Sequence, residues 1–234
     1  MKAMIFAAGR GSRLRPLTDT LPKALVEVAG QTLLEHVVLR LIGAGVTEVV
    51  INLHHLGEQI PPFVERHSGF GLRRVAYSDE PVLLGTGGGL KKAAWFFDDD
   101  EPFLVHNADV LSTVDLGGLL LAHRRTQALA TLAVMARPTK RPLHFDSAGR
   151  LVGRRTSEGR DEQVREPEGN VVPLGFCGIQ AVSPNLFERL SESGTFGIAE
   201  AYLRLSGAGE TILGQRVEGA KWRDCGRPED LHAL

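Results

Sequence analysis

Cysteine is scarce in this sequence: its 234 residues include two, Cys177 and Cys225. Two cysteines cannot form a disulfide framework, and no Cys/His spacing typical of a zinc site is present. We therefore expect both to be small, half-buried side chains in the reducing cytoplasm. Long apolar segments are missing as well. No run approaches the ~18 residues of a membrane-spanning helix, and residues 1–2 lead into a strand pattern rather than a signal peptide.

An excess of one charge is also missing. The chain has 27 Lys and Arg against 28 Asp and Glu, a net charge of −1, with both signs interleaved. This balance predicts neither nucleic acid nor a membrane surface as a partner, so any affinity for phosphate must be local. A hydrophobic content of 43% is ordinary for a globular protein, and the length is enough for one large core.

The first half of the chain alternates between strand and helix patterns. Strands are predicted over 2–7, 46–53, 72–78 and 102–106, and helices over 32–43, 57–65 and a glycine-opened segment, 87–97. This order predicts an α/β fold: a Rossmann-like, doubly wound, mixed but mostly parallel sheet with helices on both faces.

The second half is less regular and predicts a smaller, more antiparallel inserted lobe. Strands are expected at 129–135, 143–145, 151–153, 171–182, 212–217 and 221–224, and helices at 116–127, 184–190, 198–205 and 228–234. A turn at 146–149 joins a hairpin, and 156–170 is a candidate mobile loop over a binding mouth. Without a linker between the halves, we expect one domain, 1–234.

The loop after the first strand is the most informative segment. It follows the apolar run 3–8 and carries two glycines, three arginines and a lysine: Gly9, Arg10, Gly11, Arg13, Arg15 and Lys23. Free backbone N–H groups and cations at the carboxyl end of a parallel strand form an anion site, which here indicates polyphosphate.

Two other phosphate-binding motifs fit this loop poorly. A dinucleotide turn needs a third small residue and an immediate helix, whereas Leu14 stands there and Pro16 and Pro22 follow. The strand 46–53 also lacks the acidic residue that a nicotinamide-dependent dehydrogenase needs at its end. No Gly-Lys-Ser/Thr follows the loop, so the Walker pattern fails too.

The run 7–18, Ala-Ala-Gly-Arg-Gly-Ser-Arg-Leu-Arg-Pro-Leu-Thr, resembles the signature of the sugar-1-phosphate nucleotidylyltransferases. Segments 22–25, 28–30, 84–89, 107–110, 175–179 and 222–226 match the same family in order, so the resemblance covers nearly the whole chain. The Thr-Gly-Gly-Gly element at 86–89 and the short length look most like the N-acetylmuramate-1-phosphate uridylyltransferases.

The resemblance implies an enzyme that joins a nucleoside triphosphate and a sugar-1-phosphate, with Mg2+, as a monomer or homodimer. UTP with N-acetylmuramate-1-phosphate is the first choice. A GTP-dependent mannose- or heptose-1-phosphate guanylyltransferase and a CTP-dependent cytidylyltransferase are alternatives within the class. A non-catalytic regulatory subunit that binds nucleotide sugar is the alternative outside it.

Roles for single residues follow from the chemistry and the resemblance together. Arg13 is expected to hold the departing β/γ-phosphates and Lys23 the α-phosphate, and Asp109 and Asp224 supply the hard oxygen atoms that Mg2+ favours. Nucleotide contacts are expected from Ala7, Ala8, Gly9, Gly11, Ser12, Gly85, Thr86 and Gly87. Asn107 and Gly178 are expected to contact the sugar phosphate. Residues 1–110 would then form the nucleotide-binding part and 111–234 the sugar-phosphate-binding part.

One departure concerns the sugar. Many relatives carry Glu-Lys-Pro soon after the hairpin, where the glutamate binds sugar hydroxyls, but this chain has Val-Gly-Arg-Arg-Thr at 152–156. Glu166 is a late substitute by position. Arg154 and Arg155 are instead candidates to bind an acidic sugar such as the lactyl-bearing muramate.

Overall fold

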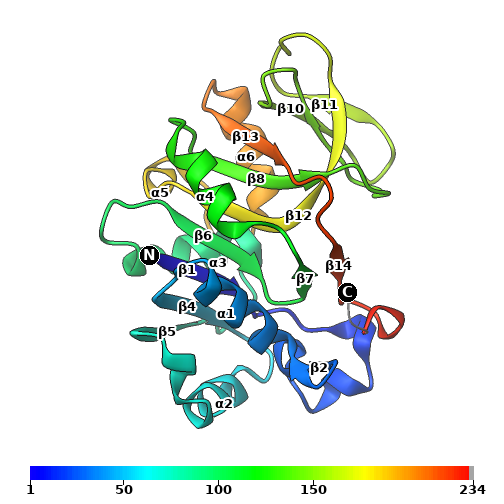
Figure 1. The fold of residues 1–234 in the computed structure, drawn as a ribbon. Helices are drawn as coiled ribbons and strands as arrows, with labels where there is room; N and C mark the ends of the chain where they lie inside the picture. The colour runs from blue at the N-terminus through cyan, green and yellow to red at the C-terminus, as the bar shows by residue number, and fades with distance from the viewer. Residues whose placement is uncertain (232–234) are drawn as a thin grey trace.

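The computed structural model describes residues 1–231, whose strands form one large mixed sheet and two small ones (Figure 1). The large sheet contains β1 (Lys2–Phe6), β4 (Glu48–Leu53), β5 (Arg74–Asp79), β6 (Phe103–Asn107), β8 (Ala130–Met135), β9 (Leu143–Phe145), β10 (Leu151–Arg155), β11 (Asp161–Gln163), β12 (Val172–Val182) and β13 (Ile212–Arg216). Its order is β11-β10-β9-β12-β6-β1-β4-β5, and β8 joins β12 and β13.

The direction of the strands changes at β12. Strands β6, β1, β4 and β5 run parallel, whereas β12 runs antiparallel to β6, β8 and β9. The hairpin of β9 and β10 continues the antiparallel part, and β11 pairs with β10. The α/β, Rossmann-like fold class predicted from the sequence is therefore confirmed.

Helices cover both faces of the sheet because successive side chains of a strand point to opposite faces. In β1, Ala3 and Ile5 join the cluster that contains α1 (Leu33–Gly43), α2 (Ile60–Arg66) and α4 (Leu116–Arg124). Met4 joins a second cluster, with α3 (Gly85–Lys92), α5 (Leu186–Arg189) and α6 (Ile198–Gly207). In Figure 1, α1 and α4 lie in front of the sheet and α3 and α6 behind it.

A third, smaller cluster joins segments that are far apart in the sequence. It contains Leu14, Val26, Val28, Leu33, Leu111 and Cys225. Around it lie two short sheets, β2 (Glu27–Val28) with β3 (Gln31–Thr32) and β7 (Val110–Ser112) with β14 (Trp222–Asp224). The sequence predicted a strand at 221–224, where β14 lies, but neither the other three strands nor the two pairings. This cluster holds the glycine loop against the turns after β6 and β14.

Several boundaries differ from the predicted ones. The expected loop at 156–170 contains β11, because residues Asp161–Gln163 pair with β10. The expected helix at 87–97 begins two residues earlier and ends at Lys92, before a 3-10 turn at Ala94–Phe96. The expected helix at 228–234 is a 3-10 turn over Pro228–Asp230, and its last three positions lie outside the described residues.

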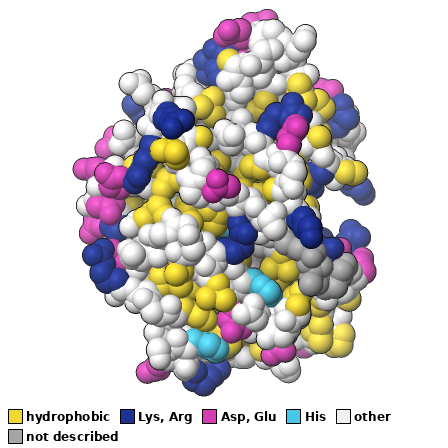
Figure 2. Space-filling model, viewed as in Figure 1, with side chains coloured by type: hydrophobic (Ala, Val, Ile, Leu, Met, Phe, Trp, Pro, Cys, Tyr) yellow, Lys and Arg dark blue, Asp and Glu magenta, His cyan; other side chains and the backbone are white. Residues whose placement is uncertain are grey.

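Three expectations from composition can also be compared with the structure. Cys177 and Cys225 are free of disulfides, as expected, but both are fully buried rather than half-buried. Within residues 1–231, every helix is too short or too polar to cross a membrane. On the described part of the face drawn in Figure 2, basic and acidic side chains both occur, in keeping with their interleaving along the sequence.

The glycines of α3 have a packing reason to be glycine. A Gly costs a helix about 1 kcal/mol relative to Ala, so the run at 85–89 reads as an exposed backbone segment in the sequence. The structure places it in the first turns of α3, where the sequence predicted a helix that opens on glycines, and packs it against the segment around Phe196. A Cβ at Gly87 would overlap the Phe196 ring, and one at Gly88 would lie 2.6 Å from the carbonyl oxygen of Gly194.

We expect Gly87→Ala to lower the free energy of unfolding by about 1–2 kcal/mol. Overpacking costs ~1–3 kcal/mol, and the better helix propensity of Ala returns up to ~1 kcal/mol. Denaturant unfolding measures the change. Gly43→Ala is the matched control, because Gly43 ends α1 with no atom within 4 Å of an added Cβ, and it should be neutral or stabilising. Equal effects of the two substitutions would contradict the packing argument.

Candidate active site

The glycine loop folds back on itself after β1. It contains three 3-10 turns, at Ser12–Leu14, Leu17–Asp19 and Lys23–Leu25. Gly11 has φ +62°, and a Cβ there would come within 2.7 Å of Thr18 and 3.2 Å of Lys23. The Thr18 hydroxyl donates to the carbonyl of Gly11 at 2.8 Å. Glycine at this position therefore lets the end of the loop, with Lys23, pack against its beginning.

An ion pair joins this loop to the turn after β6. The Lys23 ammonium contacts Oδ2 of Asp109, and the two side chains are 11% and 26% exposed. The two residues are 86 positions apart in the sequence. The structure thus places the predicted phosphate-binding lysine and one predicted metal-ligating carboxylate side by side.

Asp224, the second predicted carboxylate, lies at the same place. It ends β14 opposite Val110 of β7, and the N–H of Cys225 donates to the carbonyl of Asp109 at 2.8 Å. Arg13 lies beside Asp224, and both side chains pass close to Gly226. A Cβ added at Gly226 would lie 2.5 Å from Arg13 Nη2 and 2.6 Å from Asp224 Oδ1, so both groups are near the same point.

The carboxylate of Asp224 is poorly compensated. Burial raises its pKa above the ordinary 3.8, and the nearby charge of Asp109 raises it further, while Lys23 and Arg13 act in the opposite direction. Its Oδ1 is buried without a hydrogen-bond partner in the described part of the chain. A buried, unpartnered carboxylate oxygen beside a second carboxylate is a donor set that fits a hard divalent cation such as Mg2+.

Such a cation would need further oxygen ligands. Within residues 1–231, no three His, Cys, Asp or Glu side chains are grouped as a metal site. Asp109 and Asp224 would therefore share the cation with water and with substrate oxygens, as Mg2+ commonly requires.

The predicted nucleotide-binding segments are held together by two residues that the sequence patterns did not single out. The N–H of Ala7 donates to Asn52 Oδ1 at 2.7 Å, and Asn52 Nδ2 donates to Glu80 Oε1 at 2.7 Å. The other oxygen of Glu80 accepts from the N–H of Leu84, directly before Gly85, at 2.9 Å. The sequence signal that could have identified them is a polar residue near the end of the buried strand β4, Asn52, and another directly after the parallel strand β5, Glu80.

The remaining predicted nucleotide contacts differ in how open they are. Ala8 is buried, whereas Gly9 and Ser12 are exposed. An added Cβ at Gly9 would meet no atom within 4 Å, so the backbone there is open to a ligand. Gly85 and Gly87 pack against the segment around Phe196, so their α-carbons face protein.

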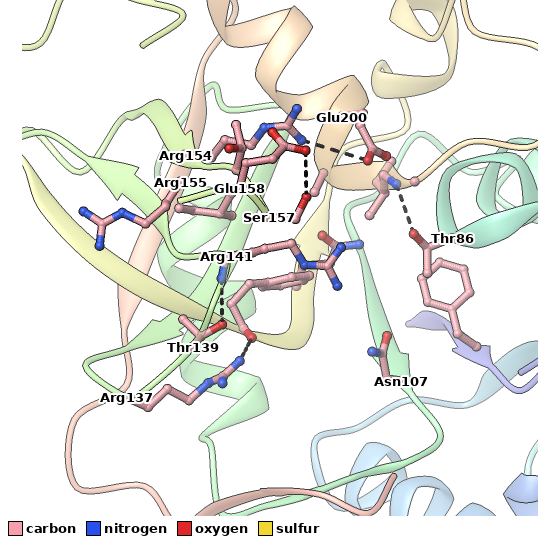
Figure 3. Close-up of a pocket in the computed structure, with 18 residues that line it drawn as sticks. Thr86, Asn107, Arg137, Thr139, Arg141, Arg154, Arg155, Ser157, Glu158 and Glu200 are labelled. Atoms are coloured by element: carbon pink, nitrogen blue, oxygen red, sulfur yellow. Dashed lines mark hydrogen bonds and ion pairs between the residues drawn. The ribbon is translucent and has the colours of Figure 1, made fainter. Parts of the chain in front are cut away.

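A cavity of about 580 Å³ opens beside these segments (Figure 3). Thr86 and Asn107 line it, together with Phe6, Phe176 and several arginines. Asn107 and Gly178 are adjacent, because a Cβ at Gly178, which has φ +71°, would lie 2.7 Å from Asn107 Nδ2. The structure therefore brings the two predicted sugar-phosphate residues together, although Gly178 itself is not part of the cavity wall.

A second hollow of about 580 Å³ contains Arg13 and Asp224 in its wall. Arg137 borders both hollows and was not predicted from the sequence. Its guanidinium lies 4.1 Å from the Trp222 ring centre, and Nη2 donates to the carbonyl of Phe176 at 2.7 Å. Arg137 thus lies between the cavity and the charged cluster, the name used below for Arg13, Lys23, Asp109 and Asp224.

Three histidines near the strand ends each form a hydrogen bond with a backbone carbonyl, His106 through Nδ1 with that of Asn107 at 2.8 Å. His54 and His55 bond to the carbonyls of Glu80 and Thr18 at 2.8 and 3.1 Å. His106 is fully buried, and burial lowers its pKa to about 4, so it is neutral at pH 7.

We expect Asp224→Asn to raise the melting temperature of the metal-free protein at pH 7. The pKa of Asp224 is higher in the folded protein than in the unfolded chain, so the ionised carboxylate destabilises the folded state. The protein is therefore most stable below the pKa of the unfolded chain and loses stability as the pH rises through the pKa of the folded state. The gain from Asn should therefore shrink as the pH falls toward about 4. Thermal unfolding across pH measures this. Asp79→Asn, at an exposed strand end, is the control, and a wild-type protein as stable as D224N at pH 7 would contradict the expectation.

Comparison with protein families gives an independent result. A family model described as "Nucleotidyl transferase" matches residues 2–148.

Two curated proteins show how far the similarity extends. N-acetylmuramate alpha-1-phosphate uridylyltransferase of Neisseria meningitidis serogroup B is 36% identical over 234 aligned positions, which cover 97% of this chain and 93% of that protein. Mannose-1-phosphate guanylyltransferase catalytic subunit beta of Dictyostelium discoideum is 29% identical, and the match covers 99% of this chain but 62% of that protein.

A solved structure shows the same fold. UDP-glucose pyrophosphorylase from Acinetobacter baumanii superposes with a TM-score of 0.77 at 18% identity, and the match covers 98% of this chain and 90% of that one.

Proposed function

The chain belongs to the nucleotidyl transferase family, and we propose that it joins a nucleoside triphosphate to a sugar-1-phosphate, giving a nucleoside-diphosphate sugar and pyrophosphate. The observation that carries this proposal is the convergence of Lys23, Asp109, Asp224 and Arg13 beside a cavity lined by Asn107. Two cations and two carboxylates at the carboxyl edge of a parallel sheet suit a triphosphate.

The proposed reaction needs little proton transfer. A phosphate monoester has a second pKa of about 6, so at pH 7 a sugar-1-phosphate is already mostly a dianionic nucleophile. One of its oxygens attacks the α-phosphorus of the nucleotide, the bond from that phosphorus to the bridging oxygen of the β-phosphate breaks, and pyrophosphate leaves with the electron pair. Catalysis then consists of positioning and charge neutralisation.

The charged cluster would supply that neutralisation. Lys23 would contact the α-phosphate and Arg13 the departing β/γ-phosphates. Asp109 and Asp224 would hold Mg2+, which when bound neutralises charge on the phosphate oxygens. The buried, unpartnered Oδ1 of Asp224 supports this assignment, because a bound cation would compensate it.

The rest of the site would hold the two substrates. In this proposal the nucleotide lies on residues 1–110, against the backbone of Ala7 to Ser12 and of Gly85 to Gly87, which Asn52 and Glu80 hold in place. The sugar phosphate lies toward residues 111–234, near Asn107 and Gly178. We expect the reaction to occur in the cytoplasm, where nucleoside triphosphates are available.

UTP and N-acetylmuramate-1-phosphate are the substrates that we propose. The similarity to the Neisseria protein of that printed activity, at 36% identity and nearly full coverage of both chains, supports them. GTP with mannose-1-phosphate is the second candidate, because a mannose-1-phosphate guanylyltransferase subunit is 29% identical over nearly the whole of this chain.

A matrix of nucleoside triphosphates and sugar-1-phosphates, with pyrophosphate release as the readout, tests the proposal. We expect the highest kcat/KM for UTP with N-acetylmuramate-1-phosphate and loss of turnover when EDTA removes Mg2+. Higher efficiency with GTP and mannose-1-phosphate would favour the second candidate. No turnover in any combination would argue against the enzyme class and for a nucleotide-sugar-binding regulatory subunit.

We expect Lys23→Ala and Asp109→Asn each to lower kcat by about 10²–10⁴-fold, because each removes a charge that stabilises the transition state. Lys92→Ala, at the exposed end of α3, is the matched control and should keep the wild-type kcat. Circular dichroism and denaturant unfolding verify that the variants fold. Near wild-type rates in both folded variants would overturn the two roles.

A further inference from the structure

The large cavity contains more arginines than carboxylates, and most of these charges are paired. Its charged lining residues are Arg137, Arg141, Arg154, Arg155, Glu158 and Glu200. Arg154 donates to Glu162 at 2.8 Å and lies 4.0 Å from Glu200. Arg155 donates to Asp161 at 2.8 Å. Arg154 and Arg155, the two candidates from the sequence for binding an acidic sugar, therefore already have carboxylate partners.

Arg141 differs from them. Within residues 1–231, its guanidinium takes part in no hydrogen bond or ion pair, and only its backbone N–H is engaged, with the Thr139 hydroxyl at 3.3 Å. The carbonyl of the next residue, Pro142, accepts from the N–H of Arg155 at 2.9 Å. The backbone that carries Arg141 is thus held on both sides while the charged end of the side chain is free.

The direction of the side chains separates the arginines further. In Figure 3, Arg141 extends across the middle of the cavity, on the side toward Asn107, whereas Arg155 turns its guanidinium away from that space. Arg154 reaches toward Glu200. Arg141 is therefore the arginine that a sugar in the cavity would meet.

Arg137 belongs to the other side of the site. It interacts electrostatically with Asp224, stacks on Trp222 and donates to the carbonyl of Phe176. Its position between the two hollows places it next to the charged cluster rather than in the middle of the cavity. Among the arginines of the cavity wall, Arg141 is therefore the one whose guanidinium forms no hydrogen bond or ion pair within residues 1–231.

We propose that Arg141 binds a carboxylate carried by the sugar ring and so selects an acidic sugar-1-phosphate over a neutral one. This inference rests on the proposed function and adds to it the residue that recognises the sugar. A planar guanidinium donates two parallel hydrogen bonds to the two oxygens of a carboxylate, a pairing that a neutral hydroxyl, with its single oxygen, does not offer. In N-acetylmuramate the lactyl carboxylate is attached on the ring, away from the anomeric phosphate. Its partner should therefore lie in the cavity wall, apart from Lys23 and Arg13, as Arg141 does.

The test compares Arg141→Gln with the wild-type enzyme on two substrates that differ in the lactyl group, N-acetylmuramate-1-phosphate and N-acetylglucosamine-1-phosphate, both with UTP. We expect kcat/KM for the muramate substrate to fall about 10–100-fold, since hydrogen bonds to charged groups contribute ~1.5–3 kcal/mol. The value for the glucosamine substrate should change less than about 3-fold. Arg141→Lys should recover part of the lost efficiency, because it keeps the charge but not the paired donors.

Equilibrium binding of UDP-N-acetylmuramate and UDP-N-acetylglucosamine to the same variants repeats the comparison without turnover. Arg216→Gln is the matched control, because Arg216 forms an ion pair with Glu218 at 2.6 Å outside the cavity wall. It should leave kcat/KM for both substrates, and the affinity for both nucleotide sugars, at the wild-type values.

Each other outcome overturns the inference in a different way. Equal losses on both substrates would show that Arg141 acts on the phosphate, and no loss on either would show that it is only solvated. A selective loss in Arg154→Gln instead would return the role to that arginine. If the wild-type enzyme turns over mannose-1-phosphate but not the muramate substrate, the proposed substrate fails as well. If only the selectivity of Arg141→Gln is missing, the proposed function stands and this inference falls.

Discussion

The burial of Leu14, Leu111 and Cys225 in one small cluster is the constraint on which the charged site depends. Each residue is a near neighbour in sequence of a charged one: Arg13, Asp109 and Asp224. Because these apolar side chains are drawn together out of water, the adjacent charged side chains are brought to the same edge. The pairing of β7 with β14 and the bond from Cys225 N–H to Asp109 then set the two carboxylates in register.

The two carboxylates of the charged cluster are compensated to different degrees. Lys23 neutralises Asp109 in part, but Asp224 keeps a buried oxygen without a partner and a raised pKa. Groups that are poorly compensated in the free protein commonly mark functional sites, since a cation or substrate supplies the missing partner. The neighbouring Arg137, stacked on Trp222, connects this edge to the cavity in which the sugar would lie.

Two kinds of support surround the site. Asn52 and Glu80 hold the backbone after β1 and before α3 through buried hydrogen bonds. The glycines of α3 allow the segment around Phe196 to approach that helix closely, which places the start of α6 beside the cavity. Hydrogen bonds therefore set the part of the site proposed to hold the nucleotide, and close backbone packing sets the part proposed to hold the sugar.

The sequence by itself determined the layered α/β fold and the glycine loop, because these depend on local hydrophobic periodicity and on residues close together in the chain. It also singled out Lys23, as the last cation of the glycine loop, and Asp109, which closely follows a parallel strand whose end lies at the same edge of the sheet. The pairing of β7 with β14, the packing of the α3 glycines against Phe196 and the difference between Arg141 and Arg154 were decided only by the tertiary structure. Each depends on contacts between distant segments: which strand end meets which, where Phe196 packs, and which arginine finds a carboxylate. A local sequence pattern cannot predict such contacts, because they join residues that are far apart in the chain.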